Sequence, residues 1–268
     1  MISTAVSDII SPEVNFDALV DTFRGAEPFH HVVIDNFFEP SIAEGLSAEF
    51  PEFSSDVWAE YNNPLEIKKS SNNWNRFPPL TYTVFNYLNS AEFVAMVSTL
   101  AGDALYADPG LNGGGWHTHS PGGKLNTHLD YSLHPKLGLE RRINLIVYLQ
   151  PGWKAEWGGA LGFWAQDESG NGPGELKQQI PCLYNRAVLF DTSMNSWHGL
   201  PEGVHSPDGI CRNSMAVYYL CQPRAHAADR GRALYAPSAD QTNDKSILEL
   251  TKLRSQVSTS GSVYRTKP

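Results

Sequence analysis

The middle of the chain, residues 103–222, is a succession of short segments rich in β-branched and aromatic residues. Gly, Pro or Asn residues bound these segments, and no helical segment of useful length separates them. Parallel strands need long crossover connections, which are usually helices. The pattern therefore favours an antiparallel sandwich or jelly roll over a parallel α/β sheet. The segments are KLNTHLDYSL, RRINLIVYLQP, GGALGFWAQD, RAVLFDTS and SMAVYYLCQP.

The regions on either side of this β-rich core are expected to be largely helical. In residues 1–102, helical periodicity predicts helices at 15–23, 39–51 and 89–102, and a strand-like run predicts a strand at 31–38. Residues 223–268 form a C-terminal extension, whose closing helix is expected at 240–256. No internal repeat or linker divides the chain, so we expect residues 1–268 to form a single domain, mainly β with flanking helices.

A polar, Asn-rich stretch with scattered aromatic residues lies at 56–80. The simplest interpretation is a surface loop. Long loops in compact domains are often functional, so the alternative is a lid over a binding site.

Composition excludes some classes of protein. The formal net charge is −9, and no basic run is longer than IKK or ERR, which argues against a nucleic-acid partner. No apolar run reaches the roughly 18–20 residues of a membrane span, and the start of the chain is a poor signal peptide. The three cysteines have no framework spacing, which is typical of thiols in a reducing compartment. We therefore expect a cytoplasmic protein.

Three residues in the β-rich region could hold a metal ion. His128 and Asp130 lie two positions apart in a strand-like segment, so their side chains project from the same face. His198 follows the next-to-last strand segment, just before another turn. Two neutral imidazoles and one carboxylate on one face of a divalent ion form the facial triad of non-haem Fe(II) oxygenases.

Arg212 and Ser214 also lie two positions apart, at the start of an apolar strand segment. A buried guanidinium needs an anionic partner, because an unpaired buried charge is costly. That partner could be an Asp or Glu of the protein or the carboxylate of a ligand, which an Arg can bind through two hydrogen bonds.

In this combination and order, these motifs resemble those of the Fe(II)/2-oxoglutarate-dependent dioxygenases, most closely the prolyl-hydroxylase-like branch. The resemblance covers roughly residues 80–225 and includes the supporting segments RRINLIVYLQPGW and EWGGALGFW. It implies a double-stranded β-helix, which is a distorted jelly roll, with the N-terminal helices packed on the outside of the larger sheet.

The resemblance also implies roles for the five motif residues. His128, Asp130 and His198 would bind Fe(II), and Arg212 would pair with the distal carboxylate of 2-oxoglutarate, with Ser214 assisting. O2 would be the second cosubstrate. Related halogenases have Ala or Gly in place of Asp130, so the aspartate favours hydroxylation or another C–H oxidation. Desaturation, epoxidation and cyclisation stay open.

Further contacts are expected around this centre. Asn144 and Tyr148 lie on one face of a strand and could contact the cosubstrate, and Leu125 could line the same pocket. His117 and His119, in GGGWHTHSPGG, are expected to line the pocket or contact the substrate rather than bind metal.

The stretch 56–80 offers further candidate substrate contacts, namely Lys68, Lys69, Asn72, Asn73, Trp74 and Arg76. His134 and His205 lie in turn-like contexts and are expected to face solvent.

The expected function is oxidation of a C–H bond in a small polar molecule, such as an intermediate of specialised metabolism. The acidic chain would tolerate a cationic substrate such as an amino sugar. Two alternatives remain: a protein hydroxylase of the prolyl type and a non-catalytic jelly-roll binding module. The sequence leaves the oligomeric state open.

Overall fold

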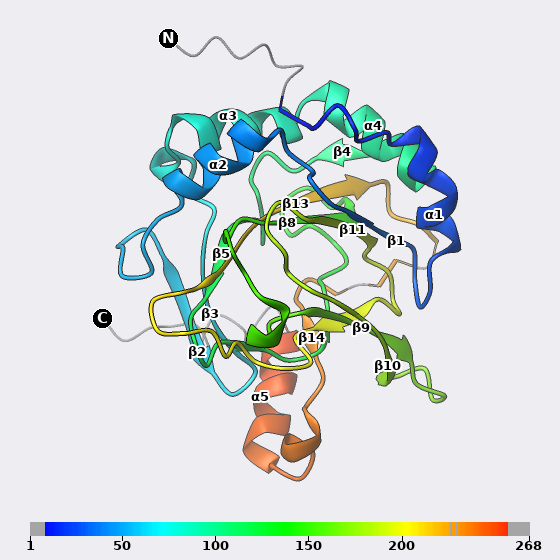
Figure 1. The fold of residues 1–268 in the computed structure, drawn as a ribbon. Helices are drawn as coiled ribbons and strands as arrows, with labels where there is room; N and C mark the ends of the chain where they lie inside the picture. Colours follow the sequence, from blue (N-terminus) through cyan, green and yellow to red (C-terminus); the bar gives the residue numbers. More distant parts are fainter. Residues whose placement is uncertain (1–8, 226, 229, 257–268) are drawn as a thin grey trace.

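Two antiparallel sheets face each other in the computed structural model, which describes residues 9–225, 227–228 and 230–256 (Figure 1). The large sheet has the order β1 (His31–Ile34), β11 (Ala187–Asp191), β8 (Glu140–Tyr148), β13 (Arg212–Cys221), β5 (Gly115–His119), β3 (Glu66–Ser71) and β2 (Ala59–Asn63), with β4 (Tyr106–Ala107) on β13 and β6 (Lys124–Leu125) on β3. The small sheet has the order β10 (Pro173–Ile180), β9 (Leu161–Gln166), β12 (Trp197–Gly199), β7 (His128–Leu129) and β14 (Leu234–Tyr235). The predicted double-stranded β-helix is confirmed.

Four helices cover the outer face of the large sheet (Figure 1): α1 (Val20–Gly25), α2 (Pro40–Glu49), α3 (Pro79–Leu88) and α4 (Ala91–Ala101). A fifth helix, α5 (Lys245–Ser255), packs beside β14. Short 3-10 turns complete the described elements: η2 (Asp17–Leu19), η3 (Trp74–Arg76), η4 (Ala155–Trp157) and η5 (Ala239–Gln241). Gly102 takes the left-handed conformation that ends α4, as its position in the sequence predicts.

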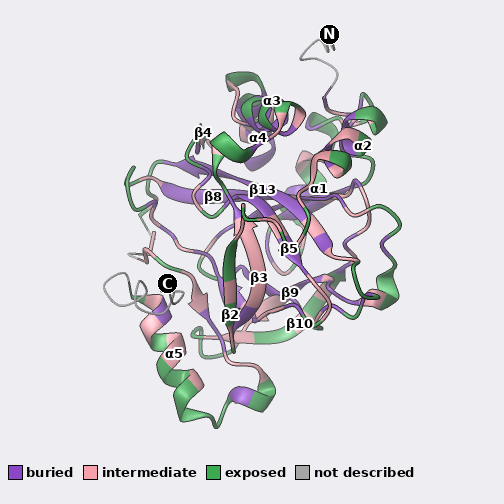
Figure 2. Ribbon diagram, turned by 90° about the vertical axis from the view of Figure 1, so that its left-hand side faces the viewer, coloured by how far each residue is buried: buried purple, intermediate pink, exposed green. Residues whose placement is uncertain are grey.

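Alternation along the central strands separates the main core from the interior of the barrel. Ile143, Leu145 and Val147 of β8 pack in the apolar cluster under the helices. Asn144 and Ile146 project from the opposite face into a cavity between the sheets. Figure 2 shows that β8 and β13 are buried along their length, as expected for strands covered on both faces.

The stretch 56–80 is not the loop that its polar composition suggested. Residues 59–71 form the β2–β3 hairpin, and β3 pairs with β5 in the large sheet. The sequence analysis did not predict helix α3, which begins at Pro79, a residue type common in the first turn of a helix. The region before residue 103 therefore supplies strands to the barrel as well as the helices that cover it. The N-terminal residues 1–8, which the signal-peptide argument used, lie outside the described residues.

Asn185 links the helical layer to the sheets. Its backbone has a positive φ of 57°, and its side chain is buried. The side-chain amide donates to the carbonyl of Phe38 at 2.8 Å, and its oxygen accepts from the Phe38 N–H at 2.9 Å. Both backbone groups of Phe38 thus depend on one side chain.

We expect Asn185→Ala to lower the free energy of unfolding by about 2–4 kcal/mol, because two buried backbone groups lose their partners. Chemical denaturation measures this change. Asn243→Ala, at an exposed position before α5, is the control and should change stability by less than about 0.5 kcal/mol. Equal stability of the two variants would contradict this account of Asn185.

Candidate active site

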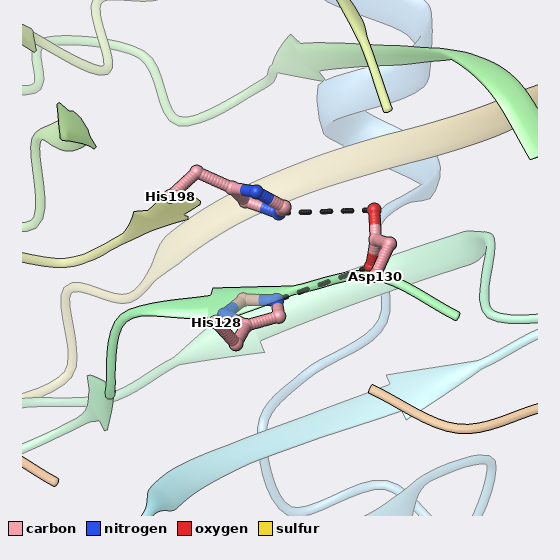
Figure 3. Close-up of side chains that lie close together, drawn as sticks. All are labelled: His128, Asp130 and His198. Carbon is pink, nitrogen blue, oxygen red and sulfur yellow. Dashed lines mark ion pairs between the residues drawn. The ribbon is translucent and has the colours of Figure 1, made fainter. Parts of the chain in front are cut away.

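Two histidines face each other across neighbouring strands of the small sheet. His128 on β7 and His198 on β12 are direct partners in the antiparallel register, and their ring centroids lie 4.3 Å apart. Asp130 lies just beyond the end of β7, with carboxylate oxygens 3.9 Å from His128 Nε2 and 3.7 Å from His198 Nε2 (Figure 3). The sheet register therefore brings together three residues that are up to 70 positions apart in the sequence.

Backbone carbonyls orient both imidazoles. His128 Nδ1 lies 2.9 Å from the carbonyl oxygen of Asn126, and His198 Nδ1 lies 2.8 Å from that of Ser196. A carbonyl only accepts, so each Nδ1 carries the proton and each Nε2 keeps a free lone pair. Burial lowers the pKa of His128 to about 3 and also lowers the pKa of His198. Both rings are therefore neutral at pH 7, as metal ligands must be.

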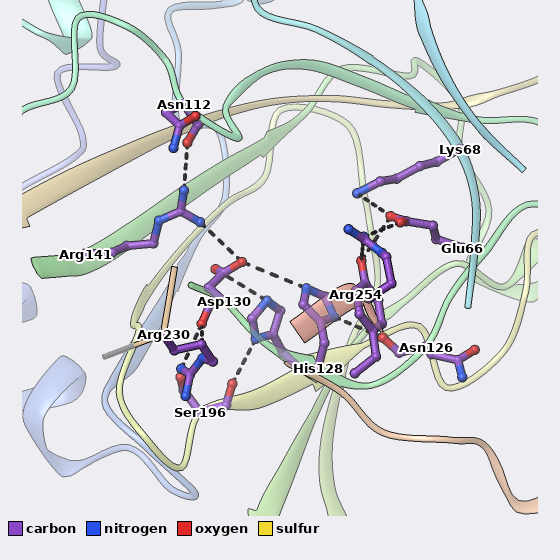
Figure 4. A network of polar contacts seen from close by, with 12 residues as sticks. Glu66, Lys68, Asn112, Asn126, His128, Asp130, Arg141, Ser196, Arg230 and Arg254 are labelled. Atoms are coloured by element: carbon purple, nitrogen blue, oxygen red, sulfur yellow. Dashed lines mark hydrogen bonds and ion pairs between the residues drawn. The ribbon is translucent and has the colours of Figure 1, made fainter. Parts of the chain in front are cut away.

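Asp130 is held by two arginines (Figure 4). Arg141 Nη1 lies 3.3 Å from Asp130 Oδ1, and Arg230 donates twice to the Asp130 backbone carbonyl, at 3.0 and 2.8 Å. Burial alone would raise the pKa of Asp130, but the positive charges around it, above all that of Arg141, outweigh burial and lower the pKa below its usual value. The group is therefore an ionised carboxylate, and its Oδ2 is buried with no hydrogen-bond partner among the described residues.

Arg141 is itself fixed on three sides. Its guanidinium lies over the rings of Tyr131 and Tyr218, 3.5 and 3.3 Å from their centroids, and donates to the carbonyl of Asn112 at 2.7 Å. The sequence analysis treated this arginine only as part of a basic run. Its place at the start of the apolar run INLIVY, in a strand expected to be buried, was the signal for a buried ion pair.

The donor set fits a divalent cation. One atom from each of His128, Asp130 and His198 lies within 4.8 Å of the other two. The two histidine–carboxylate separations are short enough for one ion to bridge at bonds of about 2.0–2.2 Å. The Asp130 Oδ2 is an acceptor with no hydrogen-bond partner among the described residues, and the two Nε2 lone pairs lie beside the same carboxylate, so one cation could bind to all three groups.

Arg212, the first residue of β13, is buried and points into the same interior. Its Nε donates to the carbonyl of Gly159 at 2.6 Å, and Nη2 donates to the hydroxyl of Tyr148 at 3.3 Å. A side chain at Gly159 would place its Cβ 2.9 Å from Arg212 Cδ, so this close approach requires glycine. None of the ion pairs found among the described residues includes Arg212. The interpretation of Arg212 as half of an internal salt bridge is therefore wrong.

One cavity of about 620 Å³ joins these groups. Of the residues proposed from the sequence, those that line it are His117, His119, Lys68, Leu125, Asn144, Ser214, Arg212 and the three candidate metal ligands. Asn72 and Asn73 also line it, and Tyr148 lies behind Arg212. The sequence analysis missed further lining residues, including Glu66, Tyr218, Arg232, Tyr235 and Arg254.

Lys69 does not line the cavity, and its Nζ donates to the carbonyl of Phe53 at 3.1 Å. Two further residues of the predicted substrate set also lie elsewhere. Trp74 packs against the helices and donates from Nε1 to the carbonyl of Pro109 at 2.8 Å. Arg76 forms an ion pair with Asp56 at the surface. Neither lines the cavity, so the expectation that they contact substrate is not supported by their position.

The expectation for His134 was wrong. The ring is buried rather than facing solvent, because its Nδ1 accepts from the backbone of Lys136 and Leu137 and its Nε2 lies 3.5 Å from Asp108. His205 is exposed, as predicted.

A family model described as the 2OG-Fe(II) oxygenase superfamily matches residues 114–239, which include the three candidate metal ligands and Arg212. Over this segment, which is just under half of the chain, the protein is similar to the 2OG-Fe(II) oxygenase superfamily. Members of that superfamily use Fe(II) and 2-oxoglutarate with O2 as cosubstrate, and the three candidate metal ligands of this chain lie within the matched segment. Members of this superfamily are oxidoreductases.

Proteins similar to this chain include prolyl hydroxylases. The chain is 30% identical over 178 residues to the prolyl 3-hydroxylase OGFOD1 of Mus musculus, an alignment that covers 66% of this chain and 30% of the mouse protein. The chain thus spans about a third of the length of that relative. The fold is similar to a prolyl-4-hydroxylase from Pseudomonas putida, with a TM-score of 0.54 and 15% identity over 77% of this chain and 99% of the other. A prolyl hydroxylase from Trichoplax adhaerens gives a TM-score of 0.51 and 14% identity over 76% and 88%.

Within the described part of this chain, no helix combines the length and the apolar character needed to cross a membrane.

We expect Arg141→Gln to weaken Mn(II) binding, with Mn(II) as the redox-stable probe, by about 10–100-fold, because Asp130 loses the cation that orients and ionises it. Isothermal titration calorimetry measures the affinity, and denaturation checks that the variant stays folded. Arg76→Gln, which breaks a surface ion pair outside the cavity, is the control. If a folded Arg141→Gln protein bound Mn(II) as tightly as the parent, Arg141 would have no part in the metal centre.

Proposed function

We propose that this chain is an Fe(II)- and 2-oxoglutarate-dependent oxygenase that oxidises a C–H bond of a small polar molecule. In this proposal His128, Asp130 and His198 hold the metal, and Arg212 with Ser214 binds the distal carboxylate of 2-oxoglutarate. One observation carries it: two imidazoles, a carboxylate with an unpaired oxygen, and an arginine with no carboxylate partner in the described part of the chain all line a single cavity.

Bound Fe(II) and 2-oxoglutarate supply the activation of O2 and the oxidation of the substrate carbon. The chain supplies position, charge and the exclusion of water. Burial raises the pKa of Tyr148 to about 12, so its hydroxyl keeps its proton at pH 7. Because Arg212 donates to the Tyr148 oxygen, the Tyr148 proton can be directed to a carboxylate held between Tyr148, Arg212 and Ser214.

The cavity's walls favour a compact substrate. The β2–β3 hairpin contributes Tyr61, Lys68 and Ser70, and the segment after residue 223 contributes Gly231 and Tyr235. A volume of about 620 Å³ holds a five-carbon cosubstrate together with one small molecule. The carboxylate of Asp130 occupies a metal position that halide would need, which favours C–H oxidation over halogenation.

Hydroxylation of a prolyl residue in a protein is the second candidate. It is favoured by the sequence similarity to a mouse prolyl 3-hydroxylase over 178 residues. A screen for O2 consumption with small polar molecules in one arm and proline-containing peptides in the other separates the two candidates. A product heavier by one oxygen atom identifies the hydroxylated substrate.

A cytoplasmic location is part of the proposal, because the three cysteines are free.

We expect the full chain with Fe(II) to convert 2-oxoglutarate to succinate, and His198→Ala to lower this conversion to the level of metal-free protein. The variant loses one of two nitrogen ligands, so it should also fail to bind Mn(II). His205→Ala, at an exposed histidine, is the control and should keep both properties. Metal-dependent succinate formation by folded His198→Ala protein would exclude His198 as a ligand.

A comparison of two ligands tests Arg212. 2-Oxopentanoate has the 2-oxo acid end of 2-oxoglutarate and lacks the distal carboxylate. We expect Arg212→Gln to weaken binding of 2-oxoglutarate to the Mn(II)-loaded chain by about 10–100-fold, because a charge-assisted hydrogen bond is lost, and to leave binding of 2-oxopentanoate unchanged. Calorimetry gives both affinities. An equal loss for both ligands would mean that Arg212 supports the pocket without binding the carboxylate.

A further inference from the structure

A row of polar side chains crosses the inner face of the large sheet beside the metal centre. Arg212 on β13 is the register partner of His119 on β5. On the other side of β5, Lys69 pairs with Thr118, so the same register carried one residue further places Lys68 beside His119. The row therefore consists of two cations, Arg212 and Lys68, with an imidazole between them, and all three line the cavity.

Lys68 is incompletely paired within this row. Its Nζ lies 3.4 Å from Glu66 Oε2, which is longer than a good hydrogen bond. Glu66 is already the acceptor for Arg254 and for the hydroxyl of Tyr235 (Figure 4). One buried carboxylate thus serves two cations, which leaves this cluster with a net positive charge.

The imidazoles beside Lys68 add unused hydrogen-bonding capacity. Both ring nitrogens of His119 and the Nε2 of His117 are buried with no hydrogen-bond partner in the part of the chain that the structure describes. Burial lowers the pKa of His117 to about 3 and that of His119 well below its usual range. Each ring is therefore neutral at pH 7 and has one N–H. That of His117 is used in a hydrogen bond to the Gly113 backbone, which leaves its Nε2 as an acceptor, whereas the N–H of His119 has no partner among the described residues and can be donated to a ligand. Buried polar groups without partners are rare unless a ligand or water satisfies them.

The charge of the cavity is opposite to that of the chain. Five cationic side chains and two carboxylates line it, an excess of three positive charges, whereas the whole chain has a formal net charge of −9. A metal dication and a dianionic cosubstrate would cancel each other and leave this excess unchanged. The earlier expectation that a cationic substrate would be tolerated is therefore not supported inside the cavity. The charged residues are Lys68, Arg141, Arg212, Arg232 and Arg254, with Glu66 and Asp130.

We propose that Lys68, together with the N–H of His119, forms an anion subsite that binds a carboxylate or phosphate group of the substrate. This rests on the proposed function, in which Arg212 is occupied by 2-oxoglutarate and cannot serve the substrate. The subsite lies on β3 and β5, and Asp130 and the two metal-ligand histidines lie across the cavity from the large sheet. The substrate is thus a small acid, held by its anionic group at Lys68 while a C–H bond faces the metal.

The experiment uses the full chain loaded with Mn(II) and saturated with 2-oxoglutarate. The probes are acetate, inorganic phosphate and acetamide, which matches acetate in shape and has no charge. Paramagnetic Mn(II) speeds the nuclear relaxation of a molecule held near it, and Zn(II)-loaded protein gives the diamagnetic reference. We expect saturable relaxation enhancement for acetate or phosphate and none for acetamide. Stronger binding of acetate indicates a carboxylate substrate, and stronger binding of phosphate a phosphorylated one.

Three variants locate the effect. Lys68→Gln should weaken binding of the anionic probe by about tenfold or more, because a charge-assisted hydrogen bond is lost. Lys68→Arg should keep most of the affinity, since it keeps the charge. Lys177→Gln, at an exposed lysine on β10, is the matched control and should bind as the parent does.

Several results would overturn the subsite. Equal relaxation of acetamide and acetate, or unchanged anion binding in folded Lys68→Gln protein, would show that no charge-selective site exists there. A loss of 2-oxoglutarate affinity in Lys68→Gln with normal affinity for 2-oxopentanoate would assign Lys68 to the cosubstrate instead. Failure of the parent to bind Mn(II) and 2-oxoglutarate at all would overturn the proposed function, and with it the subsite.

Discussion

The structure depends on keeping an ionised carboxylate inside a cavity between two sheets. Asp130 is only 9% exposed, and burial on its own favours the neutral acid. Arg141 reverses that preference from one side, while two backbone-oriented imidazoles approach from the other. The result is a set of acceptors that is fixed before any metal arrives, so little reorganisation is needed on binding.

The same constraint explains the architecture around the centre. The ligand histidines are register partners on short strands of the small sheet, so their separation is set by backbone pairing rather than by loops. Arg141 comes from the long strand β8 of the opposite sheet, and the two sheets must stay face to face for its guanidinium to reach Asp130. Apolar residues such as Phe163 and Phe190 fill the space between the sheets next to the cavity and hold that geometry.

The sequence predicted what local patterning can encode. Short β-rich segments with no helices between them predicted the fold class, and the two-residue spacing of His128 and Asp130 predicted that their side chains lie together. The sequence could not predict that β12 lies next to β7, because neither segment alone determines which distant strand it pairs with. The role of His198 therefore came from family resemblance. Polar composition made the β2–β3 hairpin look like a loop, because β2 is an exposed edge strand and β3 is only partly buried, so Lys68 was expected on a loop rather than on a strand.

X-ray absorption spectroscopy of the full chain loaded anaerobically with Fe(II), before and after addition of 2-oxoglutarate, tests the central claim most directly. The account predicts one ferrous ion per chain with nitrogen and oxygen ligands, including two imidazoles. It predicts that both imidazoles remain when the cosubstrate binds. Sulfur ligands from a cysteine, or fewer than two imidazoles on the iron, would contradict a centre built from His128, Asp130 and His198.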